Sequence, residues 1–225
     1  MAALLKAYPD FIGLEDDIVS AYKTVINDLY NEGLRTLQID DCTWGCLVDD
    51  DFIASFIEKS DRDKEIIRQE FAERFLNINN RVFQNNPEDL VINTHVCRGN
   101  YASTWFGKGG YDKIADKLFG KEDVNAYYLE FDTERAGTFE SLAKVSGEKK
   151  VVLGLITSKN PTLEEKEIVI NRIKEASKYV PLDRLYLSPQ CGFASTEEGN
   201  RLTEEEQWAK LRFIKEISDE VWGEN

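Results

Sequence analysis

The 225-residue sequence lacks any run of apolar residues that approaches the roughly 20 residues needed to span a membrane. The N-terminal segment Met-Ala-Ala-Leu-Leu-Lys is too short to be the apolar core of a secretory signal. Linkers, internal repeats, low-complexity tracts and Gly-rich phosphate-binding turns are also absent. The sequence therefore predicts one globular domain, located in the cytoplasm and without a membrane-spanning segment.

Basic residues are outnumbered by acidic ones. The chain has 28 Lys and Arg residues against 42 Asp and Glu residues, which gives a formal net charge of -14. This charge repels phosphate backbones and anionic membranes, whereas nucleic-acid-binding proteins usually carry a clustered basic face. The composition thus argues against nucleic acid and membranes as partners.

Histidine and cysteine are scarce. The single histidine is His95, and the four cysteines are Cys42, Cys46, Cys97 and Cys191. A chain of this size without a secretory signal is not expected to carry a disulfide framework. The cysteines are therefore expected to be free thiols, core residues or metal ligands, and their spacing matters more than their number.

Five short segments rich in β-branched and aromatic residues predict buried strands. These segments are Thr36 to Asp40, Val91 to Val96, Ala126 to Phe131, Val151 to Thr157, and Leu185 to Gln190. Between the strands, apolar residues recur at helical spacing, as in Leu14 to Leu29 and Ile66 to Ile78. Alternating helices and strands are typical of a parallel sheet with crossover helices.

Three local signals mark helix ends. Gly33 is expected to end the first helix. Thr162 with Glu165, and Thr203 with Glu206, match the capping box that opens a helix. The sequence thus predicts helices that begin after Thr162 and after Thr203.

Five parallel strands are compatible with an open doubly wound sheet or with part of an eight-stranded barrel. No Gly-rich turn supports nucleotide binding, and polar residues gather at the C-terminal ends of the predicted strands, where barrel enzymes place their active sites. We therefore expect an incomplete TIM (β/α)8-type barrel with about five βα units.

Four potential metal ligands come from three predicted strand ends: His95, Cys97, Glu130 and Cys191. His95 and Cys97 are two residues apart in a strand, so their side chains point to the same face. Imidazole, thiolate and carboxylate groups together suit zinc.

Spacing alone leaves two other interpretations of these residues. A His-x-Cys pair on a strand is often simple core packing, because cysteines are among the most buried residues. Alternatively, Cys42 and Cys46 form a closed structural site with His95 and Cys97.

Polar residues at two further positions are candidates for substrate contacts. Asp40 and Asp41 end the first predicted strand, where a carboxylate could bind an ammonium group or instead cap a helix or form a surface salt bridge. Arg98, Asn100 and Tyr101 follow the His-x-Cys pair and either line the same mouth or lie in a solvated loop.

Four strings, taken in order, resemble a known family. They are Leu-Gln-Ile-Asp-Asp at 37–41, His-Val-Cys-Arg-Gly-Asn at 95–100, Tyr-Leu-Glu-Phe-Asp at 128–132 and Ser-Pro-Gln-Cys-Gly-Phe at 188–193. The set resembles the C-terminal catalytic barrel of cobalamin-independent methionine synthases, especially the shorter single-barrel bacterial members. The resemblance spans nearly the whole chain, so residues 1–225 are expected to form the C-terminal part of such a barrel.

The resemblance implies that zinc is held by His95, Cys97, Glu130 and Cys191, and that Asp40 holds the amino group of homocysteine. It also implies transfer of a methyl group from 5-methyltetrahydrofolate, as the polyglutamate, to the homocysteine sulfur to form methionine. Zinc lowers the pKa of a bound thiol, so the sulfur would arrive as the nucleophilic thiolate.

Two departures from the family pattern bear on these expectations. Full synthases have a His-Ser pair after the seventh strand, and the matching position here is Thr157, so the methyl donor and the general acid are not assigned.

The strand from Thr36 to Asp40 resembles the fourth family strand, so the chain is expected to contain strands four to eight. Self-association or a partner fragment would then cover the open edges. An inactive fragment, or a related zinc enzyme that alkylates another thiol, is the alternative.

Overall fold

The computed structural model describes residues 6–57 and 61–223, so most of the N-terminal segment considered above as a signal lies outside the described residues. Five strands form one parallel sheet. They are β1 (Thr36–Asp40), β2 (Val91–Val96), β3 (Ala126–Glu130), β4 (Lys150–Ile156) and β5 (Leu185–Pro189). Every predicted strand occurs, with bounds that differ from the prediction by one residue at most.

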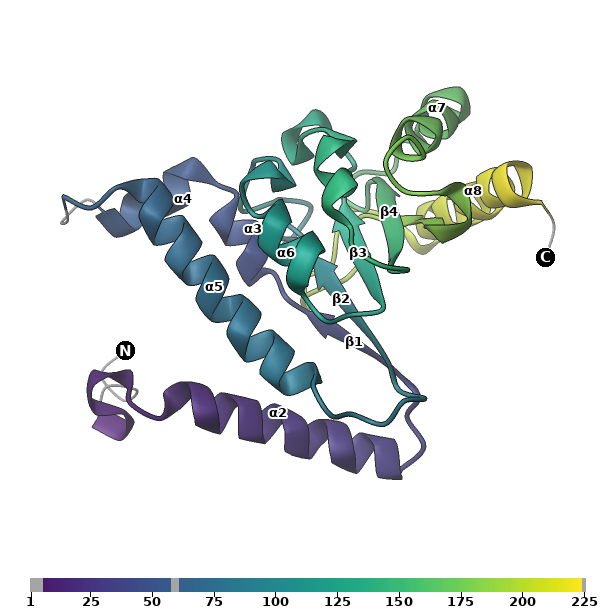
Figure 1. Cartoon of the computed structure of the whole chain (residues 1–225). Helices are drawn as coiled ribbons and strands as arrows, with labels where there is room; N and C mark the ends of the chain where they lie inside the picture. The colour runs from purple at the N-terminus through teal and green to yellow at the C-terminus, as the bar shows by residue number, and fades with distance from the viewer. Residues whose placement is uncertain (1–5, 58–60, 224–225) are drawn as a thin grey trace.

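The strands lie in the sheet in the order β1-β2-β3-β4-β5, so each one pairs with the next along the chain (Figure 1). A doubly wound sheet would reverse its strand order at a switch point, whereas a barrel adds each strand beside the last. The predicted α/β fold with five parallel strands is confirmed, and the sequential order is that of a barrel arc.

Helical segments connect the strands. They are η1 (Pro9–Phe11), α2 (Leu14–Asn31), α3 (Thr43–Leu47), α4 (Asp50–Ile57), α5 (Lys64–Phe83), η2 (Tyr111–Lys113), α6 (Ala115–Lys121), η3 (Glu134–Ala136), η4 (Phe139–Lys144), α7 (Lys166–Ala176), η5 (Leu182–Arg184) and α8 (Glu204–Trp222). Within residues 6–57 and 61–223, no helix combines the length and the apolar character needed to cross a bilayer.

The two faces of the sheet differ in what covers them. On one face, apolar residues such as Val96, Leu129 and Leu153 are at most 1% exposed and belong to a core shared with the helices. These positions alternate along each strand with residues of the opposite face. The helices therefore cover one side of the sheet, as they do on the outside of a barrel.

The opposite face carries a row of side chains that crosses all five strands. In register, Asp40 pairs with His95, His95 with Tyr128, Tyr128 with Val152, and Val152 with Tyr186. A cavity of about 520 Å³ lies over this face, near the C-terminal ends of the strands. This face corresponds to the interior of a barrel.

The outer edges of β1 and β5 pair with no further strand in the part of the chain that the structure describes. Beside β1, helix α2 exposes an apolar stripe: Tyr22, Val25 and Leu29 are 48%, 55% and 42% exposed. These residues recur at helical spacing, so one side of α2 presents a partly exposed apolar surface in the described structure.

Two of the predicted helix-end signals are confirmed. Helix α2 ends at Asn31, and Gly33 follows with a φ of 104°, a conformation that glycine adopts without strain. Thr203 and Glu206 form the reciprocal capping box that opens α8.

The capping box predicted at Thr162 is wrong. Helix α7 begins at Lys166, and its N-cap residue Glu165 makes no side-chain capping bond. Lys210 of α8 donates to the Thr162 carbonyl at 2.7 Å and lies 3.2 Å from the Glu164 carboxylate. Glu164 also accepts the Thr157 backbone N–H at 2.8 Å. These contacts hold the segment in the connection after β4, so the helix starts later.

Replacing Thr203 by Ala should lower the free energy of unfolding by about 1 kcal/mol, because the backbone N–H of Glu206 loses its capping acceptor. Chemical unfolding monitored by circular dichroism measures the loss. Thr203→Ser keeps the hydroxyl and should retain most of the stability, and equal losses in both variants would contradict a capping role.

Candidate metal centre

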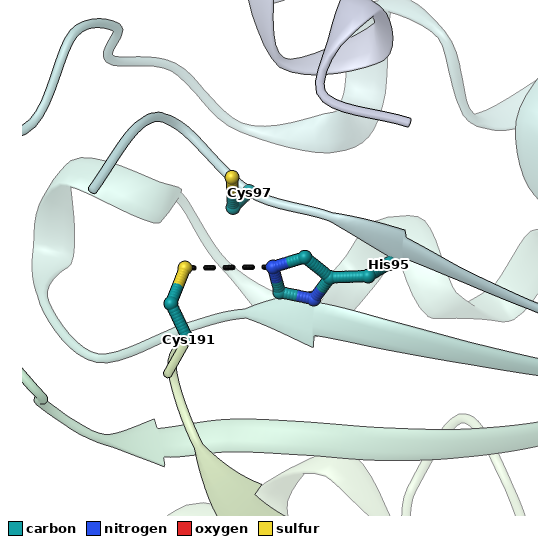
Figure 2. Close-up of side chains that lie close together, drawn as sticks. All are labelled: His95, Cys97 and Cys191. Carbon is teal, nitrogen blue, oxygen red and sulfur yellow. Dashed lines mark hydrogen bonds between the residues drawn. The ribbon is translucent and has the colours of Figure 1, made fainter. Parts of the chain in front are cut away.

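Three potential ligands meet on the open face of the sheet. His95 lies in β2, Cys97 directly follows that strand, and Cys191 follows β5. Figure 2 shows the three side chains close together, with the Cys191 sulfur facing the His95 ring, and one ligand atom from each lies within 4.8 Å of the other two. The Cys191 Sγ is 3.4 Å from the His95 Nε2. The prediction that His95 and Cys97 point to the same face is confirmed.

Gly154, in β4, allows the chain at the end of β5 to pass close to the β4 backbone. A Cβ atom at Gly154 would lie 2.7 Å from the Leu129 carbonyl oxygen and 3.0 Å from the Gln190 Cα. The pairing of β4 with β5 also shifts register between Gly154 and Ile156. On a flat sheet, β2 and β5 would be three spacings of about 4.8 Å apart, roughly 14 Å. The close approach over Gly154, which any side chain would block, therefore helps Cys191 reach His95.

The backbone just after β2 is also packed closely, by a helix. A Cβ atom at Gly45, in α3, would lie 2.0 Å from the Cys97 carbonyl oxygen. Helix α3 therefore touches the backbone of Cys97 directly. Trp44, the neighbouring residue, is fully buried and fixes α3 in the core.

The sulfur and imidazole groups strongly affect one another's protonation. A hydrogen bond from the Cys191 thiol, helped by one with His95, lowers the pKa of Cys97 to about 4, although burial opposes the shift. The same hydrogen bond, together with burial, raises the pKa of Cys191. Burial lowers the pKa of His95, but its hydrogen bond to Cys97 and the nearby negative charges outweigh this effect, so the pKa is raised overall. The centre therefore favours a negative charge on Cys97.

Glu130 lies next to this trio but is held by protein donors. It is fully buried at the end of β3. Its Oε2 accepts the Arg98 backbone N–H at 2.9 Å and the Gln190 Nε2 at 3.0 Å, and its Oε1 accepts from the Arg135 guanidinium. It does not belong to the group of three that lies within common reach of an ion. Its predicted role as a ligand stays a prediction.

Asp40 lines the same cavity as the trio. It pairs in register with His95, and partial burial raises the pKa of its carboxyl group, a shift that His95 opposes. Its neighbour Asp41 points elsewhere and accepts hydrogen bonds from Thr43 and from Asn79, the latter at 2.6 Å. Only Asp40 of this pair therefore faces the candidate site.

The alternative site built on Cys42 and Cys46 is not formed in the described residues. The one group of potential ligands found there contains Cys191 and neither of these two cysteines. Cys42 lines the large cavity, whereas Cys46 lines a separate apolar cavity with residues such as Leu47 and Phe75. Burial raises the pKa of Cys46 to about 11, which keeps it a neutral thiol.

The residues after the His-x-Cys pair have different positions. Arg98 is 1% exposed, and its guanidinium donates to backbone carbonyls such as that of Gly109 rather than lining the mouth. Asn100 does line the cavity and donates to the Gly192 carbonyl at 2.8 Å. Tyr101 is 54% exposed and lies outside it.

Sequence reasoning missed two residues that shape the centre, Gln190 and Gly154. Gln190 precedes Cys191 and is 1% exposed, and its side chain contacts both Glu130 and Cys191. Its position in the string Ser-Pro-Gln-Cys was the available signal. Nothing local in the sequence marks Gly154, because its role depends on contacts with two other strands.

Comparisons with known proteins agree with this geometry. The model of the family described as "Cobalamin-independent synthase, Catalytic domain" matches residues 14–217. The uncharacterized protein YxjG of Bacillus subtilis is 45% identical over 214 residues, which cover 95% of this chain and 55% of YxjG. A methionine synthase of Pyrococcus horikoshii is 30% identical over 103 residues, or 46% of this chain and 27% of that protein. The chain spans about half the length of the curated relatives that match most of it.

Solved structures have the same architecture. A Listeria monocytogenes protein, provisionally assigned as a vitamin-B12-independent methionine synthase, aligns with a TM-score of 0.70 at 37% identity, over 94% of this chain and 56% of that one. A B12-independent methionine synthase from Shewanella, in complex with selenomethionine, aligns with a TM-score of 0.61 at 18% identity, over 89% of this chain and 52% of that one, and bears on the fold alone. The five-stranded sheet is thus of the TIM-barrel type, and the chain belongs to the cobalamin-independent methionine synthase family, within its catalytic domain.

Proposed function

We propose that this chain is the zinc-binding part of a methyltransferase that moves a methyl group from 5-methyltetrahydrofolate, as the polyglutamate, to homocysteine to form methionine. The observation that carries the proposal is the convergence of His95, Cys97 and Cys191 on one face of a barrel-type sheet. Membership of the methionine synthase family supports the reaction class.

The donor set fits zinc. Tetrahedral zinc with bonds of about 2.0 Å to nitrogen and 2.3 Å to sulfur needs donors roughly 3.5 to 3.8 Å apart. The Cys191 Sγ and the His95 Nε2 are already 3.4 Å apart, and the Cys97 Sγ lies within 4.8 Å of both. Glu130, at the end of the strand next to β2, is the proposed fourth ligand. Two thiolates, a carboxylate and a neutral imidazole would favour an electron-rich centre.

The cavity suits a small amino acid with a thiol. When bound, zinc would keep the substrate sulfur in its thiolate form at neutral pH, which is the nucleophilic form. Asp40 lines the same cavity of about 520 Å³ and is the proposed partner of the substrate ammonium group. It would hold the amino acid so that its sulfur lies toward His95 and the two cysteines. Geometry of this kind lowers the entropic barrier to reaction.

Thr157 is the position that matches the His-Ser pair of the full synthases. Thr157 is 9% exposed, its backbone N–H is bonded to Glu164, and its hydroxyl accepts the Lys159 backbone N–H at 3.2 Å. A threonine hydroxyl is a weak acid, so this position does not suggest a proton donor for a folate leaving group.

A related alkyl transfer to another thiol is the second candidate function. A panel of thiol acceptors separates it from methionine synthesis.

We also propose that the five strands correspond to strands four to eight of a complete barrel. The unpaired edges of β1 and β5 and the apolar stripe of α2 support this assignment, as does a match to only about half of each main relative. Three further βα units, from the same protein, a partner fragment or another copy, would complete the eight. If nothing supplies them, the chain is an inactive fragment.

Without metal, the chain should hold one thiolate near neutral pH. Cys97 has a pKa of about 4, whereas the pKa values of Cys42, Cys46 and Cys191 are raised. Because the pKa of Cys97 is depressed, its thiolate persists above about pH 4 and disappears as the pH falls through that value. The ultraviolet absorbance of thiolate in chelator-treated protein measures this. Cys97→Ser should lose the signal and Cys42→Ser should keep it, while a wild-type signal that appears only near pH 8.5 would contradict the pairing.

Purified protein should contain about one zinc per chain. Cys97→Ser and Cys191→Ser should each lose it, because each removes one thiolate, whereas Cys42→Ser should retain it. Metal content by atomic emission, with circular dichroism to verify folding, provides the measurement. Retention of zinc in Cys191→Ser together with its loss in Cys42→Ser and Cys46→Ser would establish a closed structural site instead.

In a methyl-transferring assembly that contains the complete barrel, Asp40→Asn should lower kcat/KM for homocysteine about 10- to 100-fold. This is the loss expected when one charge-assisted hydrogen bond of about 1.5 to 3 kcal/mol is removed. A thiol acid that lacks the amino group should react equally with both enzymes, and zinc content should not change. An unchanged kcat/KM for homocysteine would rule out the proposed ammonium contact.

A further inference from the structure

The side-chain amide of Gln190 bridges two of the proposed ligands. Its Nε2 lies 3.0 Å from the Glu130 Oε2 and 2.8 Å from the Cys191 Sγ. Its Oε1 accepts the Ser158 hydroxyl at 3.0 Å. The side chain therefore connects the C-terminal ends of β3, β4 and β5 through one buried amide.

The chemistry of the neighbours fixes the orientation of this amide. Rotation by 180° would place the Oε1 against the Glu130 carboxylate and the Cys191 sulfur, which are both acceptors when ionised. In the observed orientation, the two N–H bonds have two acceptors and the oxygen has a hydroxyl donor. A buried amide is costly unless its polar atoms are paired, so this arrangement is strongly preferred.

The backbone of Gln190 is fixed as well. Its N–H donates to the Ile156 carbonyl at 2.7 Å, and its Cα lies over Gly154. The amide therefore has little freedom to follow a ligand that moves. A donor held in this way sets the position of the Glu130 carboxylate and withdraws electron density from the Cys191 sulfur.

We propose that Gln190 is a positioning residue of the metal centre, which holds Glu130 beside the two cysteines and tunes the donor strength of Cys191 through an N–H···S hydrogen bond. This inference rests on the proposed zinc site. Neighbouring groups of this kind commonly change metal affinity by about 10- to 100-fold when they are removed.

The test uses the 225-residue chain with Gln190→Met, which keeps the length of the side chain and removes both N–H donors. Gln190→Glu is the second variant, because it replaces the donor with an acceptor. The matched control is Asn79→Leu. The Asn79 Nδ2 donates to Asp41 at 2.6 Å and to Glu122 at 2.7 Å, so it is a bridging amide of the same kind that contacts none of His95, Cys97 and Cys191.

Two measurements are made on each folded variant. Zinc affinity, by competition with a chromophoric chelator, should fall about 10- to 100-fold in both Gln190 variants and remain unchanged in Asn79→Leu. In the cobalt-substituted protein, the thiolate-to-metal charge-transfer band of Gln190→Met should move to longer wavelength, because the Cys191 sulfur becomes more electron-rich. A purely structural role for Gln190 would not move this band.

The outcomes separate this inference from the proposed function. If wild-type protein binds zinc but the Gln190 variants keep its affinity and its cobalt spectrum, the positioning role is overturned and the zinc site stands. If Asn79→Leu loses as much affinity as Gln190→Met, general destabilisation explains the result and the inference is also overturned. If wild-type protein binds neither zinc nor cobalt, the proposed function itself fails. If Gln190→Met does not fold, Gln190→Glu supplies the same comparison.

Discussion

The close passage of the chain over Gly154 is the constraint on which the candidate site depends. Parallel strands bring their C-terminal ends to one edge, but β2 and β5 are separated by two other strands. Cys191 contacts His95 because Pro189 and Gln190 cross directly above a residue that has no side chain. The register shift between Gly154 and Ile156 accompanies this turn toward the middle of the sheet. One glycine in β4 thus helps a cysteine after β5 share a centre with a histidine in β2.

The centre also concentrates negative charge in a buried place, which requires compensation. Glu130 is fully buried, yet both of its oxygens accept from protein donors, one of them the Arg135 guanidinium. Arg98 is buried nearby, and its guanidinium donates hydrogen bonds to the carbonyl oxygens of Gly109 and Ala136. It therefore places a second positive charge close to Glu130. These contacts compensate the buried Glu130 carboxylate with donors from the protein itself.

Much of this arrangement follows from the sequence, and the physical reasons are clear. The strands are predicted to within one residue because β-branched and aromatic residues are concentrated in these short segments. His95 and Cys97 share a face because side chains alternate strictly in a strand. The passage over Gly154 and the contacts of Glu130 depend on pairs of residues that are distant in the sequence. The helix start predicted at Thr162 is wrong for the same reason, since Lys210 of α8 holds that segment and α7 begins only at Lys166.

In the proposed barrel, the residues that would bind the metal and the units that would enclose the substrate belong to different parts of the fold. Every proposed zinc ligand and Asp40 lie in β1, β2 or β3 or just after β2 or β5. The cavity over them opens onto the face that a complete barrel encloses, and β1 and β5 leave that enclosure unfinished in the described residues. Water excluded from a closed site strengthens the electrostatic contacts inside it. In the proposed function, this chain would supply the ligand set, and methyl transfer would also need units that close the barrel around the substrate.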